Sequence, residues 1–351
     1  MDSMIRDALA ALLADRCTPQ VVRAVESGES SRELWLALRD AGFADALIGE
    51  AQGGAGLSAA TVAECWMLLG QYAMPLPLAE TMIARSLLAS AAIAAPEAPV
   101  ALGSAVRTPA GNVRCASVAG ARAAGSALVT LNGETRLLPV AQARSEPAAF
   151  ELDLTLEWSE ADWRAAQPLP DRLDARLAQA LVLSLQLAGA LDTVFKRTLS
   201  WANERVQFGK PIGKFQAIQH QLSLMAEESF AASMAARIAC LANPEHPRTT
   251  AAATLPGVLS VLDPLRIAVA KARTSEAALQ VAQMAHAIHG AIGFTHEFDL
   301  QLFTRRLHAW RQAAGSESAW HDVVGRALVA QPASGAIDLL RNATDVAVVA
   351  A

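Results

Sequence analysis

The first 96 residues show the spacing of apolar side chains that is typical of α-helices, in which residues three or four positions apart share a face. In the stretch "MIRDALAALLADRC", Ile5, Leu9, Leu12 and Leu13 fall on one stripe. Two further stretches of this kind, "SSRELWLALRDAGF" and "ATVAECWMLLGQYA", follow in the same region. We therefore expect an N-terminal helical domain over residues 1–96.

The pattern changes over residues 97–170, where apolar and polar positions alternate in short segments, as they do in half-buried β-strands. The segments "VRCASVAG", "SALVTLNGETRLLPV" and "FELDLTLEW" are bounded by Gly, Asn and Pro. Asn132 and Gly133 form a dipeptide that favours the tight turn of a β-hairpin. This region is predicted to be a small middle β domain.

Long helical patterns return over residues 171–330, joined by short turns as in a helix bundle. Asp171 is in a position to cap the first helix. Asp263, which proline follows, is in a position to start the third, and Gly290 to end it in a left-handed conformation. A shorter fourth helix is predicted after Ser316. The region is therefore expected to form a C-terminal four-helix bundle.

The succession of patterns predicts a mainly α-helical protein with a small β domain between two helical regions. The last residues, 331–351, fit either a tail or a docked helix. A chain of 351 residues, 53% of them hydrophobic, is long enough for two or three domains with a sizeable core.

Charge and composition argue against several classes of partner. A net charge of −5 with no basic stretch argues against nucleic acid. No uninterrupted apolar segment of spanning length or of secretory type occurs, so we expect no membrane association and a cytoplasmic protein. The four cysteines are scattered without a C-x-x-C pair and are predicted to be reduced packing residues. His286 and His289 lack a carboxylate or cysteine at ligand spacing, so no metal site is expected.

The segment between the first two bundle helices, "ERVQFGKPIGKFQAIQH", is more polar and more aromatic than a connecting turn requires. Arg205 carries a planar fork of donors that suits phosphate oxygens. Phe208 offers an apolar face to a flat ring system, and Gln216 can donate or accept hydrogen bonds at its polar edges. The alternative is a plain turn, with Arg205 in a surface ion pair and Phe208 in the core.

This segment resembles the R-x-x-F-G-x-P-I-x-x-F-Q-A-I-Q-H signature of the acyl-CoA dehydrogenases almost residue for residue. The stretch "IHGAIGFTHEFDLQLFTRR" is similar to the H-G-G-x-G-F-T-x-E block of that family, and "GEAQGGAGLSAATVAECWMLLGQ" to its N-terminal loop and helix. The resemblance covers both helical regions and is weak across the β domain. It implies the acyl-CoA dehydrogenase fold, with an N-terminal helical domain, a middle β domain and a C-terminal four-helix bundle.

The resemblance also implies FAD as the cofactor, clasped between subunits. The positions that match cofactor-binding positions of the family are Arg205, Gln207, Phe208, Ile212, Gln216, His289 and Gly290. The implied reaction belongs to lipid metabolism and is the α,β-dehydrogenation of an acyl-CoA thioester. A carboxylate removes the α proton, and the β hydrogen leaves as hydride to the flavin. An electron-transfer flavoprotein or a similar acceptor is the implied redox partner.

The catalytic carboxylate is not where many members of the family carry it. Counted from Gly293, their E-G-T glutamate falls on Ala314, in "QAAGSESAW". A minority of the family places the base seventeen residues before that glycine, which here is Glu276. On a helix, Glu276 would share a mostly apolar stripe and be partly withdrawn from water, as a base requires. We therefore predict Glu276 as the catalytic base.

The alternative for Glu276 is an exposed ion pair with Arg273, three residues earlier on the same helix. The catalytic interpretation is preferred because two facts coincide: the usual glutamate is missing, and the alternate one is in register. Glu297 and Glu317 are weaker candidates for the base.

Other positions depart from the family pattern. Ala287 stands where the family often has Gln, and Ala291 stands at the second glycine, where its methyl group would obstruct close approach of a backbone. The β domain is short and contains no match to the T-E-P-x-x-G-S-D stretch that lines the flavin in ordinary members. In this respect the chain resembles the shortened subunits of heteromeric bacterial acyl-CoA dehydrogenases, such as those of steroid side-chain degradation.

We therefore expect a hetero-oligomer, such as a heterotetramer, with a second acyl-CoA dehydrogenase subunit, and otherwise a homo-oligomer. The expected substrate is a bulky or steroid-derived acyl-CoA, because a short β domain and a small residue at Ala314 leave room. Two alternatives stay open. One is a non-catalytic partner subunit that completes the FAD site of a second dehydrogenase chain through Arg205, Phe208 and Gln216. The other is a redox-free helical scaffold that keeps only the fold.

Overall fold

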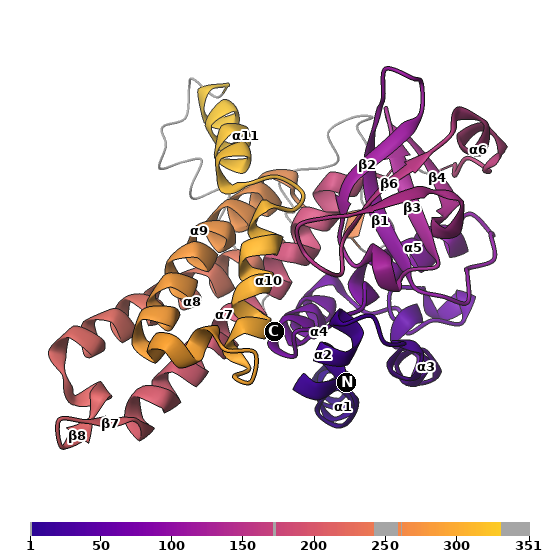
Figure 1. Cartoon of the computed structure of the whole chain (residues 1–351). Coiled ribbons are helices and arrows are strands. Elements are labelled where there is room, and N and C mark those ends of the chain that lie inside the picture. The colour runs from indigo at the N-terminus through magenta and orange to yellow at the C-terminus, as the bar shows by residue number, and fades with distance from the viewer. Residues whose placement is uncertain (1, 171–172, 242–258, 261, 331–351) are drawn as a thin grey trace, which may run out of the picture.

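The structure is a computed structural model that describes residues 2–170, 173–241, 259–260 and 262–330 (Figure 1). Helices come first, a sheet follows, and a bundle of longer helices ends the described chain, which is the predicted order. The predicted tail or docked helix at 331–351 lies outside the described residues. The domain limits drawn from the sequence stay predictions.

Five helices precede the sheet within the described residues. They are α1 (Asp2–Arg16), α2 (Pro19–Glu26), α3 (Arg32–Asp40), α4 (Ala59–Gln71) and α5 (Leu78–Ser90). The short helix α2 was not predicted, although its signals are local: the Thr18 side chain accepts a hydrogen bond from the Val21 amide, and proline occupies the first helical position. Gly42, in a left-handed conformation with φ of 82°, follows the end of α3.

The middle of the chain forms a six-stranded sheet with the strand order β4-β3-β1-β2-β6-β5. Its strands are β1 (Val100–Arg107), β2 (Val113–Val118), β3 (Ser126–Leu131), β4 (Glu134–Pro139), β5 (Arg144–Pro147) and β6 (Leu154–Trp158). Strands β1 and β3 pair in parallel and the other neighbours pair antiparallel. Asn132 and Gly133, with φ of 50° and 81°, make the predicted hairpin turn between β3 and β4. The short helix α6 (Glu160–Ala165) follows the sheet.

The C-terminal bundle consists of α7 (Ala175–Glu204), α8 (Gln216–Ala239), α9 (Pro264–His289), α10 (Leu300–Gln312) and α11 (Glu317–Val329). The cap of α7 is Asp174, whose carboxylate accepts a hydrogen bond from the Leu177 amide at 2.9 Å. The prediction of an Asp171 cap is therefore wrong, and Asp171 itself lies outside the described residues. Asp263 caps α9 as predicted. Gly290 ends α9 with φ of 66° and ψ of −148°, a glycine conformation different from the predicted left-handed one.

The predicted fourth helix after Ser316 is α11, but α10 precedes it and was not predicted. Helix α10 carries three arginines, Arg305, Arg306 and Arg311, and each of them pairs with a carboxylate. Arg306 is fully buried and forms an ion pair with Glu26 of α2, which also pairs with Arg305. Arg305 in addition pairs with Glu151 at 2.7 Å. A buried charge is tolerated when it is paired and hydrogen-bonded, so a local hydrophobic pattern does not reveal this helix.

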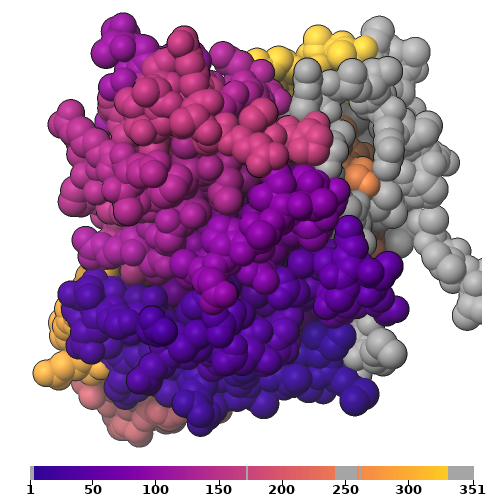
Figure 2. All heavy atoms as spheres, turned by 90° about the vertical axis from the view of Figure 1, so that its right-hand side faces the viewer, coloured from indigo at the N-terminus to yellow at the C-terminus, as the bar shows by residue number. Residues whose placement is uncertain are grey.

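Two large hydrophobic cores and a small third cluster of Val25, Phe150 and Leu152 hold the described chain together. One large core is continuous from the N-terminal helices into the bundle, and the other fills the sheet around Trp158 and Trp163. Figure 2 shows the N-terminal helices and the sheet packed directly on one another over one face of the molecule. The four cysteines are free and buried, as predicted. The N-terminal helices and the bundle therefore share one core, although the sequence suggested separate domains.

Helix α7 is the central helix of the shared core. By length and composition α7 is apolar enough to cross a membrane. However, 89% of its most apolar stretch is buried inside the protein. Helix α4 crosses α7 closely at Gly70 and Gly189. Any side chain at either glycine would collide with the backbone of the facing helix, so glycine is needed at both positions. The apolar surface of α7 is thus accounted for by packing.

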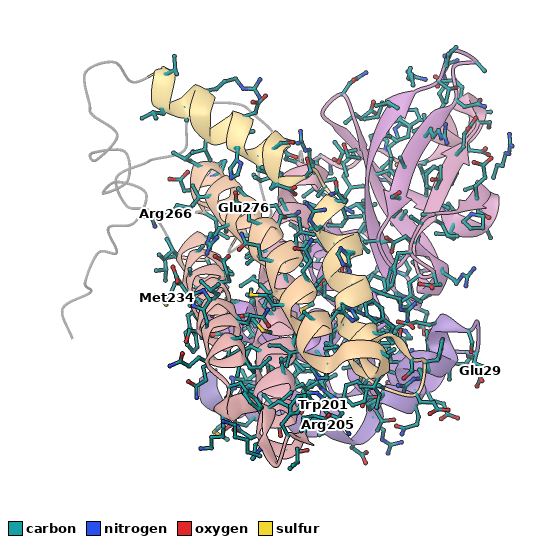
Figure 3. The ribbon with its side chains drawn as sticks, turned by 60° about the vertical axis from the view of Figure 1, so that its left-hand side comes forward. Glu29, Trp201, Arg205, Met234, Arg266 and Glu276 are labelled. Atoms are coloured by element: carbon teal, nitrogen blue, oxygen red, sulfur yellow. The ribbon has the colours of Figure 1, made fainter. Side chains whose placement is uncertain are left out.

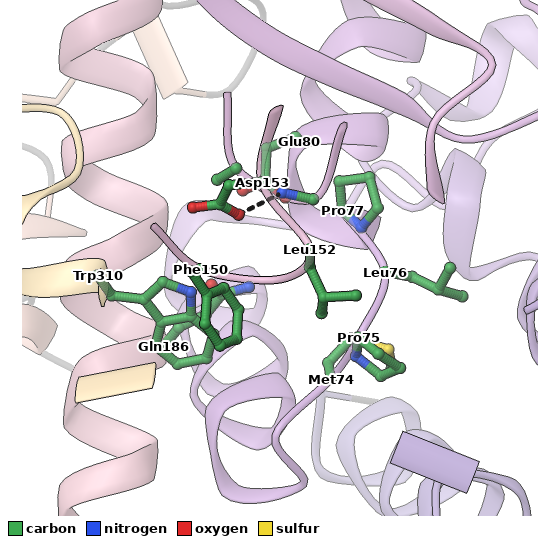
Figure 4. A pocket seen from close by; sticks show the side chains of 12 residues that line it. Met74, Pro75, Leu76, Pro77, Glu80, Phe150, Leu152, Asp153, Gln186 and Trp310 are labelled. Atoms are coloured by element: carbon green, nitrogen blue, oxygen red, sulfur yellow. Dashed lines mark hydrogen bonds between the residues drawn. The ribbon is translucent and has the colours of Figure 1, made fainter. Parts of the chain in front are cut away.

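Two buried carboxyl groups meet where the N-terminal helices, the sheet and the bundle adjoin (Figure 4). Asp153 accepts a hydrogen bond from the Gly120 amide at 3.0 Å, while Oε2 of Glu80 has no partner among the described residues. Burial raises the pKa of Glu80 to about 7, and burial likewise raises the pKa of Asp153 to about 7. Each group therefore favours its neutral form in the folded protein.

We predict that the stability of the protein falls as the pH rises from about 4 to 7 through these two groups. The folded state binds more protons than the unfolded state in this window, so its advantage is lost as the groups ionise. The Glu80→Gln variant mimics the neutral acid and cannot ionise. Between pH 5 and pH 8 its free energy of unfolding should therefore fall by about 3 kcal/mol less than that of the native protein. Urea unfolding at the two pH values measures this difference.

The matched control is Glu33→Gln, at an exposed position on α3. This variant should keep the pH dependence of the native protein. If Glu80→Gln and the native protein showed the same change in unfolding free energy, the assignment of this pH dependence to the buried pair would be wrong.

Candidate active site

A short hairpin projects from the end of the bundle, where α7 turns into α8 (Figure 1). Its strands are β7 (Val206–Gln207) and β8 (Lys210–Pro211). Phe208 and Gly209 form the turn, with φ of 52° and 79°. A positive φ is uncommon for phenylalanine and costs conformational energy. The Phe208 ring is 93% exposed, so the alternative that it belongs to the core is wrong.

Arg205, at the base of this hairpin, is exposed and has no acidic partner among the residues that the structure describes. The alternative of a surface ion pair therefore finds no support there. Its guanidinium lies 5.9 Å from the ring centre of Trp201, one helical turn earlier on α7. The two residues sit together at the lower end of the bundle in Figure 3. An unpaired guanidinium beside an exposed aromatic turn suits an anionic, flat ligand.

The aromatic stack continues into the protein from Trp201. His289, at the end of α9, stacks on Trp201 with ring centres 5.3 Å apart, and Phe298 packs against both rings. His289 Nδ1 donates a hydrogen bond to the Ala285 carbonyl at 2.8 Å. Burial lowers the pKa of His289, so the ring is neutral and its Nε2 is an acceptor.

Two buried polar atoms in this stack have no partner among the described residues: Nε1 of Trp201 and Nε2 of His289. Buried polar atoms without hydrogen bonds are rare and call for an explanation, of which a missing ligand is one. Gly290, directly after His289, leaves open space around its backbone. The region therefore fits the polar part of a dinucleotide, with Arg205 as the cation.

The remaining predicted cofactor-binding residues lie on the same hairpin and at the start of α8. Gln207 and Gln216 are exposed, and Ile212 is partly buried against the shared core. The amide of Ile212 donates to the Arg205 carbonyl at 2.8 Å, which closes the hairpin. The structure thus brings the predicted cofactor-binding residues to one end of the bundle, and Trp201 is a further member that the sequence argument missed.

Glu276 lies elsewhere, on the part of α9 away from Trp201 and Arg205 (Figure 3). Its carboxylate is 38% exposed and pairs with Arg273 at 3.7 Å and with Nε2 of His321 at 3.4 Å. Arg273 has a closer partner in Glu228, at 2.8 Å. The ion pair that was the alternative for Glu276 is therefore present. The role of Glu276 as a base stays a prediction.

Ala314, on which the family resemblance places the usual glutamate, lines a pocket between the sheet and the bundle. We call it the Ala314 pocket. It has a volume of about 210 Å³. The residues that contribute side chains or backbone from both sides include Ser104, Ala116, Ser117, Arg176, Gln179 and Ala314. None of its lining residues carries a carboxylate, and Glu276 is not among them. Glu317 forms an ion pair with Arg311.

The turn that carries Ala314 is held by a buried lysine that the sequence argument missed. Nζ of Lys271 donates to the carbonyls of Arg311 and Gly315, at 3.0 and 3.1 Å, and to the Ser275 hydroxyl at 2.8 Å. Burial lowers the pKa of Lys271 to about 7. Nothing in the local pattern of α9 distinguishes Lys271 from an exposed lysine, because its partners come from a turn some forty residues away.

The described chain thus combines N-terminal helices, a sheet and a long helix bundle with an arginine-bearing aromatic hairpin at its end. Two family models match this chain: the N-terminal domain of acyl-CoA dehydrogenase over residues 2–95, and the C-terminal domain over residues 177–329. The chain belongs to the acyl-CoA dehydrogenase family. This confirms the predicted resemblance and fold, and with them FAD as the cofactor of the family.

Curated relatives agree with this assignment. The chain is 30% identical over 325 residues to acyl-CoA dehydrogenase IpdE2 of Mycobacterium tuberculosis, covering 88% of this chain and 91% of the relative. It is 28% identical to the protein of the same name from Mycolicibacterium smegmatis, covering 89% and 94%.

Solved structures share the fold at lower identity. The ChsE4-ChsE5 complex from Mycobacterium tuberculosis has a chain that matches with a TM-score of 0.77 at 18% identity, covering 95% of this chain and 98% of that one. The Tcur3481-Tcur3483 steroid ACAD variant matches with a TM-score of 0.77 at 21% identity, covering 95% and 99%.

We predict that Gly315→Ala destabilises the protein by about 1 kcal/mol more than Gly111→Ala. Both glycines have a positive φ, 108° and 88°, so both substitutions strain the backbone. Only at Gly315 would the new methyl group also lie close to neighbours, 2.7 Å from Nη2 of Arg176 and 3.0 Å from Nε1 of Trp320. Urea unfolding of the two variants checks this, and equal losses would show that the turn is not tightly packed.

Proposed function

We propose that this chain is a subunit of an FAD-dependent acyl-CoA dehydrogenase that catalyses α,β-dehydrogenation of a bulky or steroid-derived acyl-CoA. The observation that carries the proposal is the end of the bundle, where an unpaired, exposed Arg205 adjoins two buried polar atoms on Trp201 and His289 that have no partners among the described residues. These groups would hold the diphosphate side of FAD, and Phe208 and Gln216 would line its ring systems. When bound, the flavin supplies a hydride acceptor for the β hydrogen.

Glu276 is the proposed general base for the α proton. Helix α9 holds it beside Arg273 and His321, which orient the carboxylate. In its ionised form it can accept a proton from an acidified α carbon. The α carbon becomes acidic enough when hydrogen-bond donors lie close to the thioester carbonyl oxygen. This chain or its partner would supply those donors.

A hetero-oligomer is the proposed assembly. Arg205 and its hairpin supply part of the proposed flavin site. The Ala314 pocket, at about 210 Å³, is smaller than a typical ligand pocket. Both observations favour a second, unlike chain that supplies the rest of the site. Helix α8 also exposes large apolar side chains, at Leu224, Phe230 and Met234, as subunit interfaces do. One of the solved relatives is itself a complex of two proteins, ChsE4 and ChsE5.

Relatives support the proposed substrate class and the proposed redox partner. A steroid-derived acyl group is proposed because one solved relative is a steroid ACAD. An electron-transfer flavoprotein or a similar acceptor is proposed because a further structural relative comes from work on an electron transferring flavoprotein. The proposed cellular location of the protein is the cytoplasm, where buried cysteines normally stay reduced.

A second candidate function is that of a non-catalytic partner subunit that completes the FAD site of another dehydrogenase chain. The observation that favours it is the Ala314 pocket, which has no carboxylate among its lining residues, while Glu276 pairs with Arg273 and contacts His321 outside it. In this case Arg205, Phe208 and Gln216 act on the flavin and Glu276 has a structural role only.

Replacing Glu276 by Gln separates the two candidates. If Glu276 is the base, flavin reduction by acyl-CoA in the assembled enzyme should slow by about 100-fold or more, because the amide cannot accept the proton. Stopped-flow absorbance of the flavin measures the rate, with Glu33→Gln as the control. Reduction at the native rate would support the non-catalytic role instead.

Replacing Arg205 by Met tests the cofactor site. Loss of a charge-assisted contact to a phosphate should weaken FAD binding about 10-fold or more. The FAD content of the purified assembly and the dissociation constant from flavin fluorescence report it. The control is Arg164→Met, at an exposed position on α6. Unchanged FAD binding in Arg205→Met would contradict the placement of the cofactor at this hairpin.

A further inference from the structure

The Ala314 pocket contains a cation that no acidic residue neutralises within the described chain. Arg176, in the first turn of α7, lines the pocket and has no ion-pair partner among the described residues. Its Nε donates to the Ala314 carbonyl at 3.1 Å, which leaves the two Nη groups free. An arginine with a free fork of donors in a concave site is a recognition element for a carboxylate or a phosphate.

The guanidinium is held in place from two sides. It lies 4.8 Å from the ring centre of Trp320, whose indole is 4% exposed and donates its own Nε1–H to the same Ala314 carbonyl at 3.2 Å. Gly315 leaves the space that Nη2 of Arg176 needs. A side chain fixed in this way loses little freedom when it binds a ligand, which favours affinity.

The backbone is strained on both sides of the pocket. Ser117, on the sheet side, has φ of 48° and lies in an irregularity of the β2–β6 pairing between Cys115 and Val118. Ala314, on the bundle side, has φ of 58°. Neither residue is glycine, so each conformation costs energy, and such residues cluster at ligand sites where a bulge redirects a side chain.

Polar groups of the pocket complement an anion. The hydroxyls of Ser104 and Ser117 line it and have no hydrogen-bond partner among the described residues. Nε2 of Gln179 donates to the Leu102 carbonyl at 2.7 Å, which fixes that side chain against the sheet. Hydroxyl donors and a guanidinium without any lining carboxylate form a site for negatively charged oxygens.

We propose that the Ala314 pocket binds a carboxylate carried by the acyl group of the substrate, with Arg176 as its cation. The inference rests on the proposed function and narrows its substrate class to a CoA thioester of a dicarboxylic acid. The anion could also be a phosphate of a nucleotide. The volume argues for the acyl carboxylate, because 210 Å³ equals about seven waters at roughly 30 Å³ each and admits part of an acyl group but not a nucleotide.

The test compares two CoA thioesters of equal acyl length, one ending in a carboxylate and one in a methyl group, over a series from glutaryl-CoA and pentanoyl-CoA upward. Isothermal titration of the full chain, alone or assembled with its partner, gives the dissociation constants. The native protein should bind the carboxylate-ended thioester about 10- to 100-fold more tightly. In Arg176→Gln this preference should disappear, while binding of the methyl-ended thioester changes little.

Arg176→Lys keeps the charge and removes the planar fork, so it should keep part of the preference and also serves if the Gln variant does not fold. Arg164→Gln is the control and should bind as the native protein does. Equal weakening of both thioesters in Arg176→Gln would mean that Arg176 contacts the CoA phosphates, and the proposal would be overturned. An unaltered preference in that variant would overturn it as well.

A failure of the proposed function itself has a different signature. If the native protein, assembled with its partner, bound neither thioester at any length, the proposed dehydrogenase function of this chain would be wrong. If both thioesters bound equally to the native protein, the dehydrogenase assignment would stand and only the carboxylate preference would be wrong.

Discussion

Helix α7 sets the geometry on which both proposed sites depend. Its 30 residues span about 45 Å at the usual rise per residue, and they carry Arg176 at one end and Trp201 with Arg205 beside the other. Its N-terminal half is buried on almost every side, and α4 crosses this half closely at Gly70 and Gly189. Helix α7 thus fixes the distance between Arg176 at its start and the Arg205 hairpin at its end.

The two ends of α7 differ in what they leave unsatisfied among the described residues. At the hairpin end, the guanidinium of Arg205 has no acidic partner within the described chain, and the buried atoms Nε1 of Trp201 and Nε2 of His289 have no hydrogen-bond partner there. The ring of Phe208 is exposed there. At the other end, a pocket is lined by Arg176, whose guanidinium is fixed by the Ala314 carbonyl and the Trp320 ring. The first arrangement suits a ligand shared with another subunit, and the second suits a small anionic group. The asymmetry is consistent with a chain that functions inside an unlike pair.

Local signals in the sequence were sufficient for most elements. Helical periodicity, the Asn132–Gly133 turn and the Asp263 cap act over a few residues, so inspection along the chain finds them. Helix α10 was missed because two of its three arginines, Arg305 and Arg306, pair with Glu26, about 280 residues away. Trp201 and Lys271 escaped for the same reason: their partners His289 and Gly315 are distant in sequence.

The sequence by itself determined the family, the order of helices and sheet, and the position of the hairpin that is proposed to bind the cofactor, because these depend on contiguous motifs and on short-range backbone preferences. Only the tertiary structure decided which of the described charges are paired and which are free. It placed Glu276 in an ion pair with Arg273 and in contact with Nε2 of His321, and it left Arg176 without an acidic neighbour in a pocket. Pairing of charges is a property of distance in space, which a pattern along the chain does not contain.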